Sequence, residues 1–182
     1  MFRRICKITF ISHGATVHSM AGIIGCELKY PKLNDLGEEE MEKVCEYLKQ
    51  RGVSYDRIYT CPNACCTQSA QVIAKLFKQK AQILDLNSRK YGEWQGMLYS
   101  DLLKNNGPEV LAQCPAGGET IKDFNKRVSD CIDKLIFENK GNRIIIVATH
   151  EIIQSALAKT LGLTPENQHK ILIKNRSKIK RK

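Results

Sequence analysis

The sequence predicts an α/β fold with a mostly parallel sheet flanked by helices on both faces. Short apolar runs alternate along the chain with stretches whose apolar residues recur at helical spacing, and such alternation builds parallel sheets. The most apolar run, Arg143–Ala148, is typical of a central strand that is covered on both faces. His13 and His150 each directly follow an apolar run. Because open α/β folds place their active sites at the carboxyl ends of strands, we expect the two histidines to meet there.

The first predicted strand, Cys6–Ile11, is apolar and rich in β-forming residues. A loop follows as far as Leu33, and a helix begins at Asn34 or Asp35, either of which is a good N-cap. Three glutamates follow in its first turn, where the helix dipole favours negative charge. Its apolar residues recur at helical spacing: Met41, Val44, Cys45 and Leu48.

The middle of the chain contains a short predicted strand, Tyr55–Tyr59, and then a loop that begins at Cys61. This loop leads into a helix that runs to about Lys78, and Ala81–Leu86 is the third predicted strand. A long glycine-containing loop, Ser88–Glu119, completes this part.

The last third begins with the clearest amphipathic helix, Thr120–Phe137. One stripe of this helix is apolar: Phe124, Val128, Cys131 and Leu135. The strand Arg143–Ala148 follows, then a helix over Glu151–Leu161.

The length of 182 residues predicts one domain, residues 1–173, followed by a basic tail, residues 174–182. No apolar run approaches the roughly 20 residues that span a bilayer, so we expect no membrane contact. The N-terminus resembles a first strand and not a signal peptide, because Lys7 interrupts its apolar stretch. These observations predict a cytoplasmic protein. They do not indicate an oligomeric state.

The formal net charge is +10, and six of the last nine residues are basic. A basic surface attracts nucleic acid, acidic partners or phosphorylated small molecules without specifying which of them binds. A solvated tail with no partner is the alternative interpretation.

Eight cysteines are many for this length, but a cytoplasmic chain that forms its own core keeps them reduced. The cluster Cys61, Cys65 and Cys66 lacks the usual Cys-x-x-Cys spacing, and no second cluster partners it. We therefore predict thiols in packing positions and no metal site.

Several ordered motifs resemble those of the histidine phosphatase superfamily, whose fold is phosphoglycerate mutase-like. The family pattern Arg-His-Gly-Glu/Ala-Thr is similar to Ser12–Thr16, and its second histidine corresponds to His150. The remaining motifs are similar to the following segments: Leu33–Gly37, Cys61–Ala70, Leu86–Gly92, Trp94–Gly96 and Gly118–Thr120. Because the stretch from Trp94 to Gly118 is too short for the mutases' insertion, the phosphatase branch fits better.

The resemblance implies that a neutral His13 attacks a phosphomonoester, and that water then hydrolyses the phosphohistidine. The family supplies two arginines and the second histidine to stabilise the phosphoryl charge, and a carboxylic acid to protonate the leaving oxygen. It implies no cofactor and no metal. His13 and His150 are therefore the predicted catalytic residues. The predicted substrate-binding residues are Ser12, Gly14, Thr16, Cys65, Ser88, Arg89, Tyr91, Thr149 and Glu151.

Four of these positions depart from the family pattern. Ser12 and Cys65 stand where the family has arginines, and Ser88 stands where it has the acid. Glu151 replaces the glycine after the second histidine and brings a carboxylate toward a phosphate site. Losing two charged donors and one acid would cost roughly 10⁶–10¹⁰ in rate if the effects were independent.

Three functions follow as hypotheses. The first is a degenerate histidine phosphatase with weak or absent phosphomonoesterase activity that binds a phosphorylated ligand or partner. The second is an active phosphomonoesterase that works through a phosphohistidine on His13, with substitute cations such as Lys90. The third is a basic interaction module for an acidic partner or RNA.

Overall fold

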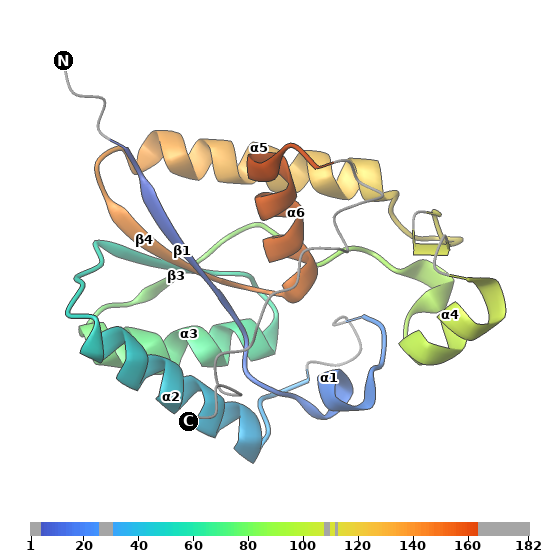
Figure 1. Ribbon diagram of the computed structural model, residues 1–182, viewed down its shortest axis with the longest axis horizontal. Coiled ribbons are helices and arrows are strands. Elements are labelled where there is room, and N and C mark those ends of the chain that lie inside the picture. Colours follow the sequence, from blue (N-terminus) through green and yellow to red (C-terminus); the bar gives the residue numbers. More distant parts are fainter. Residues whose placement is uncertain (1–4, 26–30, 108–109, 112, 164–182) are drawn as a thin grey trace.

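The computed structural model describes residues 5–25, 31–107, 110, 111 and 113–163. These residues form a four-stranded sheet with helices on both faces (Figure 1). The elements in chain order are β1 (Lys7–Ser12), α1 (Val17–Ala21), α2 (Asp35–Gln50), β2 (Arg57–Thr60), α3 (Ala64–Phe77), β3 (Ala81–Ile83), a 3-10 helix (Gly92–Trp94), α4 (Tyr99–Asn106), α5 (Ile121–Glu138), β4 (Arg143–Ala148) and α6 (His150–Leu161).

The sheet is parallel throughout and has the strand order β1-β4-β2-β3. β4 lies between β1 and β2, and the five residues Ile144–Ala148 are each 0% exposed. This confirms the prediction of a central strand covered on both faces. α2 and α3 lie on one side of the sheet, and α5 and α6 lie on the other (Figure 1). The predicted α/β class is therefore confirmed.

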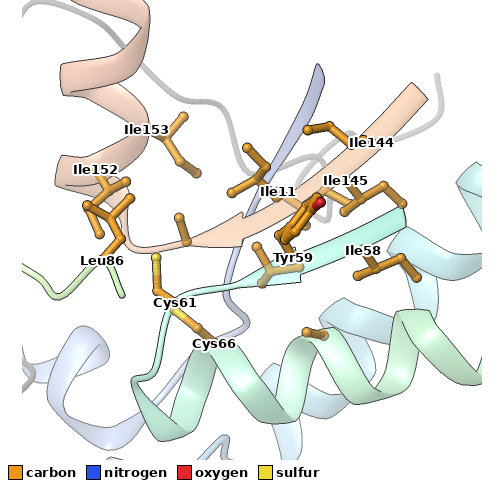
Figure 2. Packing of buried hydrophobic residues seen from close by; sticks show 14 of the residues in the cluster. Ile11, Ile58, Tyr59, Cys61, Cys66, Leu86, Ile144, Ile145, Ile152 and Ile153 are labelled. Carbon is orange, nitrogen blue, oxygen red and sulfur yellow. The ribbon is translucent and has the colours of Figure 1, made fainter. Parts of the chain in front are cut away.

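The core is formed by side chains of the sheet and of the helices that cover it (Figure 2). Ile58 and Tyr59 of β2 pack beside Ile145 of β4, and the buried thiols of Cys61 and Cys66 lie between the end of β2 and α3. On α5, the buried stripe is Phe124, Val128, Ile132 and Leu135. The sequence had placed Cys131 in this stripe, but its neighbour Ile132 is buried and Cys131 is only partly so.

Two predicted boundaries differ in ways that affect the site. β3 ends at Ile83 instead of Leu86, because the paired strand β2 ends at Thr60, opposite Ile83. α6 begins at His150 instead of Glu151, so this histidine is the first helical residue. Of the two proposed caps for α2, Asn34 is the residue whose side chain accepts a hydrogen bond, from the amide of Gly37 at 2.9 Å.

The stretches predicted as loops contain further helices. α1, the 3-10 helix and α4 lie beyond the carboxyl ends of the strands (Figure 1). A small second core joins them, with Ile24, Trp94, Leu102 and Val110 buried together. An antiparallel bridge between Ile23 and Leu98 connects the loop after β1 to the start of α4.

The predicted basic tail, residues 174–182, lies outside the described residues, so its role stays a prediction. Within the described ranges, no helix has the length and apolarity that a membrane crossing requires.

Candidate functional site

The two histidines lie at the carboxyl ends of neighbouring strands. Ser12, the last residue of β1, is in register with Ala148, the last residue of β4. The amide of His13 donates a hydrogen bond to the carbonyl of Ala148 at 3.4 Å, and His150 follows two residues later at the start of α6. The pairing of β1 with β4 thus brings together two residues that are far apart in the sequence.

The ring of His13 is held by its own loop. Nδ1 of His13 lies 2.8 Å from the carbonyl oxygen of Gly14. A carbonyl oxygen can only accept a hydrogen bond, so Nδ1 carries the proton. In the neutral ring, Nε2 then has the lone pair, which is the form that a nucleophilic histidine requires.

His150 is biased toward its neutral form. Desolvation by the surrounding protein lowers the pKa of His150, the carboxylate of Glu151 opposes this, and nearby His13 lowers the pKa further. The influence of His13 is consistent with two imidazoles that face one space. A neutral His150 can donate a hydrogen bond to a phosphate oxygen but brings no full charge.

Two helices begin at the same edge of the sheet. α3 follows β2 with Asn63 as its N-cap, and α6 follows β4 with Thr149 as its N-cap. Neither N-cap side chain accepts a hydrogen bond from its own helix. Oγ of Ser88 lies 3.5 Å from Oδ1 of Asn63 and 3.4 Å from Oγ1 of Thr149, so its single proton can be donated to either.

These contacts bring together Ser88 and Thr149, two of the predicted site residues, and add Asn63, which the sequence analysis missed. Its position directly before the helix, after Cys61 and Pro62, was the available signal. The amino ends of helices carry partial positive charge and bind anions. The convergence of α3 and α6 beside His13 and His150 therefore favours an anionic ligand.

An ion pair holds the segment that carries Ser88. The guanidinium of Arg127 on α5 donates to both carboxylate oxygens of Glu119, at 2.6 and 2.9 Å. It also donates to the carbonyls of Asn87 at 2.6 Å and Ser88 at 2.8 Å. Sequence reasoning missed this pairing, although Glu119 lies in the motif Gly118–Thr120, because a motif position does not identify the partner of its side chain. We call Glu119 and Arg127 the α5 clamp.

Arg89, a predicted substrate-binding residue, is buried among backbone carbonyls. It is 5% exposed, and its three side-chain nitrogens donate to the carbonyls of Glu119, Leu111 and Gln113 at 3.1, 3.0 and 2.6 Å. Its guanidinium carbon also lies 5.5 Å from the ring centre of Tyr91. These contacts show that Arg89 holds the loop around residues 111–119, and the predicted contact of Arg89 and Tyr91 with substrate stays a prediction.

Gly14 and Thr16 are similarly engaged with the protein. The amide of Gly14 donates to Oγ of Ser69 at 3.1 Å. Thr16 is buried and caps α1, with its hydroxyl accepting from the amide of Ser19 at 3.0 Å. The neighbouring amide of Ala15 donates to the buried carboxylate of Glu40 at 2.9 Å. These bonds fix the backbone that carries His13, so both residues position the site.

The two positions that carry arginines in the family pattern have different surroundings. Ser12 is half-buried at the end of β1, whereas Cys65 is 0% exposed, in the first turn of α3. Burial raises the pKa of the nearby Cys61 thiol to about 12, with contributions from Cys131, Glu151 and Cys65. The negative charge of Glu151 thus raises the pKa of both Cys61 and His150.

No group of three or more metal-ligating side chains comes together in the part of the chain that the structure describes. At this edge of the sheet the described residues supply two imidazoles, the hydroxyls of Ser88 and Thr149, the carboxylate of Glu151 and two helix termini. This set can bind an oxyanion and offers one nucleophile, Nε2 of His13.

Comparison with known proteins agrees with this arrangement. Residues 8–180 match the family model of the histidine phosphatase superfamily (branch 1). A broad-specificity phosphatase of Saccharomyces cerevisiae is 25% identical over 179 residues, which are 95% of this chain and 77% of that protein. The phosphoglycerate mutase-like protein 4 of Arabidopsis thaliana is 27% identical over 162 residues, 82% of this chain and 68% of that protein.

The fold is also found in solved structures. A phosphoserine phosphatase from Entamoeba histolytica, solved in complex with 3-phosphoglyceric acid, superposes with a TM-score of 0.82 at 20% identity and covers 94% of this chain and 87% of that one. An alpha-ribazole phosphatase from Shigella flexneri gives a TM-score of 0.77 at 20% identity, covering 92% and 85%. The fold is therefore phosphoglycerate mutase-like, and the chain belongs to the histidine phosphatase superfamily.

Proposed function

We propose that this protein is a degenerate histidine phosphatase, which binds a phosphorylated ligand or partner and hydrolyses phosphomonoesters weakly or not at all. The observation that carries the proposal is the contrast within the site. Its nucleophile is oriented, because the hydrogen bond from Nδ1 to Gly14 places the lone pair of a neutral His13 ring on Nε2. The positions for charge stabilisation, Ser12 and Cys65, carry no charge, and the position of the acid holds Ser88.

The first step would move an electron pair from Nε2 of His13 to phosphorus, with cleavage of the ester P–O bond. The leaving alkoxide then needs a proton, and a general acid supplies about 10²–10⁴ in rate at this point. Ser88 stands at the position of that acid, and a serine hydroxyl is far too weak an acid to replace a carboxylic acid. Water would then attack phosphorus and restore His13 while releasing phosphate.

Charge on the transferring phosphoryl group needs oriented donors, each worth about 10²–10³ in rate. In place of arginines, the amino ends of α3 and α6 supply partial positive charge, and the ring of His150 supplies a hydrogen-bond donor. This supports binding of phosphate more than it supports turnover. The alternative, an active enzyme with substitute cations such as Lys90, makes the opposite prediction for the rate.

Hydrolysis of an aryl phosphate from about pH 4 to 8 tests the proposal, because an aryl leaving group departs without an acid. We expect background rates in the wild type and in His13→Ala. The matched control is His18→Ala, which removes the nearest other histidine in the sequence. Turnover at an ordinary enzyme rate of about 1 s⁻¹ or more, lost in His13→Ala and kept in His18→Ala, would overturn the proposal and establish an active phosphatase.

Binding is measured in parallel with vanadate or inorganic phosphate. We expect the ligand to perturb the ring resonances of His13 and His150, and we expect His13→Ala to weaken the binding. The absence of binding to the wild type would contradict a phosphate pocket. We also propose a cytoplasmic location, as the sequence analysis expects.

A further inference from the structure

A groove lies between α3 and β3, away from the histidines. It has a volume of about 450 Å³ and extends along the C-terminal half of α3 and the following residues. Its floor includes Ala74, Ala81 and Ile83, and three lysines line it: Lys75, Lys78 and Lys80. No acidic residue is among the residues that line it.

We propose that this groove binds an extended acidic peptide, which adds a strand to the free edge of β3. β3 is the last strand in the order β1-β4-β2-β3, and within the described residues it pairs with β2 alone. The other edge of β3 therefore presents backbone donors and acceptors along Ala81–Ile83. Peptides use such edges, where main-chain hydrogen bonds give affinity and pockets for alternate side chains give specificity.

Two alternate side chains of β3 line the groove. Ala81 and Ile83 line the groove, whereas the intervening Gln82 does not. Ile83 is 67% exposed, which is unusual for a large β-branched residue of a strand. Apolar residues at alternate positions of an added strand would cover Ile83, while the residues between them would remain at the rim.

The charge of the rim selects an acidic peptide. Lys75, Lys78 and Lys80 are exposed, and the ion pairs found among the described residues include none of them. Three unpaired ammonium groups at one edge attract carboxylates and repel basic segments. The groove residues include no aromatic side chain on which a base could stack, which favours a peptide over a single-stranded nucleic acid.

The backbone at Lys78 adds an independent observation. Its φ of 51° places it in the left-handed region at the end of α3, where glycine is the usual residue. Lysines near a helix C-terminus also stabilise the dipole, and lysines on an edge strand discourage aggregation. Because glycine at position 78 would be unstrained, a lysine in this conformation supports a use for its side chain.

The experiment measures fluorescence anisotropy of a labelled, acetylated peptide with four Glu-Val repeats on the full chain. We expect binding that weakens with salt and falls at least tenfold when Lys75, Lys78 and Lys80 are all changed to glutamate. The control variant, with Lys49, Lys104 and Lys122 changed to glutamate, has the same net charge and should bind as the wild type does. Equal loss in both variants would overturn the proposal, because it would indicate attraction by net charge.

A second peptide, with N-methyl groups on alternate backbone amides, tests strand addition. We expect it to bind at least tenfold more weakly, and we expect the normal peptide to protect the amides of β3 from hydrogen exchange. Equal binding of both peptides would overturn the proposal. So would binding of oligouridylate, in place of the peptide, that depends on the same three lysines.

Lys78→Gly separates binding from folding. Glycine relieves the left-handed strain, so this variant should melt at a higher temperature than the wild type while binding the peptide more weakly. A variant that is more stable and binds the peptide with unchanged affinity would contradict a role for Lys78 in the groove.

Discussion

Glu119 and Arg127 form a bidentate ion pair, with 2.6 Å between Oε1 and Nε and 2.9 Å between Oε2 and Nη2. The same guanidinium donates to the carbonyls of Asn87 and Ser88, so the α5 clamp fixes the backbone at the position of the missing acid. The two side chains are 32% and 13% exposed for Arg127 and Glu119. Because the pair is bidentate and partly buried, we expect it to stabilise the fold more than an exposed surface ion pair does.

We expect Glu119→Gln to lower the free energy of unfolding by about 1–2 kcal/mol, because it leaves Arg127 without its charged partner. Chemical denaturation at pH 7 measures this difference. Glu39→Gln is the matched control, since Glu39 pairs with Lys43 on the surface at 3.7 Å, and it should change stability by less than about 0.5 kcal/mol. Equal effects of the two substitutions would contradict a special role for the clamp.

The same pair predicts a pH dependence. Burial raises the pKa of Glu119, but the hydrogen bonds and charge of Arg127 and the amide of Lys90 outweigh it, so the pKa lies below its ordinary value. The stabilisation is therefore fully present above the unfolded pKa of about 4.3 and is lost as pH falls through the lower folded pKa. The stability difference between wild type and Glu119→Gln should be constant from pH 6 to 8 and shrink below about pH 4.

Gly14 and Gly37 permit a close approach of backbone to backbone beside His13. A Cβ atom at Gly14 would lie 2.3 Å from the carbonyl oxygen of Gly37, and one at Gly37 would lie 2.1 Å from that of Ala15. We expect Gly14→Ala to destabilise the fold by about 1–3 kcal/mol and to weaken vanadate binding, because the loop that holds His13 must shift. Gly52→Ala, where the added atom meets open space, should leave vanadate binding unchanged.

The titration of His150 reports the proximity of the two imidazoles. Its pKa, which desolvation and His13 lower and Glu151 raises, should be below 6.5 in an NMR titration of the ring protons. We expect His13→Ala to raise this pKa and Glu151→Gln to lower it further. Glu46→Gln, an exposed change on α2, should have no effect. If the pKa of His150 were the same in His13→Ala as in the wild type, the two rings would not lie close enough to interact.

The cysteines should differ greatly in reactivity. Burial raises the pKa of Cys61 to about 12, so at pH 8 its reactive thiolate is on the order of one part in 10⁴. We expect iodoacetamide to label exposed Cys114 within minutes and to label Cys61 only after unfolding, as followed by peptide mass spectrometry. Labelling of Cys61 as fast as Cys114 in the folded protein would contradict the packing role predicted for these thiols.

The sequence predicted the architecture and the convergence of the two histidines because both follow from strong apolar patterns. Ile144–Ala148 could only be a fully buried strand, and His13 and His150 follow strands directly. The environment of Arg89 could not be predicted in this way. Its three carbonyl partners come from a loop without periodicity, and a motif position gives a residue type without its contacts. For the same reason, neither the α5 clamp nor the contact of Ser88 with Asn63 could be predicted from the sequence.

The surroundings of Ser88 lead to the sharpest test of the site. Ser88 is 1% exposed and its oxygen faces Oδ1 of Asn63 and Oγ1 of Thr149, both of which accept hydrogen bonds. In Ser88→Glu, a carboxyl group in these surroundings would be favoured in its protonated form, because burial penalises the charge and the acceptors favour a donor. A protonated carboxyl is what an alkoxide leaving group requires.

Three substitutions, Ser12→Arg, Cys65→Arg and Ser88→Glu, would together restore the family pattern. Cys65→Arg places a long cation at a fully buried position, so we expect it to destabilise the fold unless its guanidinium reaches the phosphate site. Ser12→Arg starts from a half-buried position and should fold. It should tighten phosphate binding about tenfold, since a charged hydrogen bond contributes about 1.5 kcal/mol or more.

We therefore expect Ser12→Arg with Ser88→Glu to hydrolyse an alkyl phosphate at least 10²-fold faster than Ser12→Arg alone, because only the double variant protonates the leaving oxygen. With an aryl phosphate, the two variants should differ far less. His13→Ala in the double variant should abolish both activities. If the double variant folds and binds phosphate tightly but hydrolyses alkyl esters no faster, Ser88 does not occupy the position of the acid, and the correspondence between this site and the family pattern is wrong there.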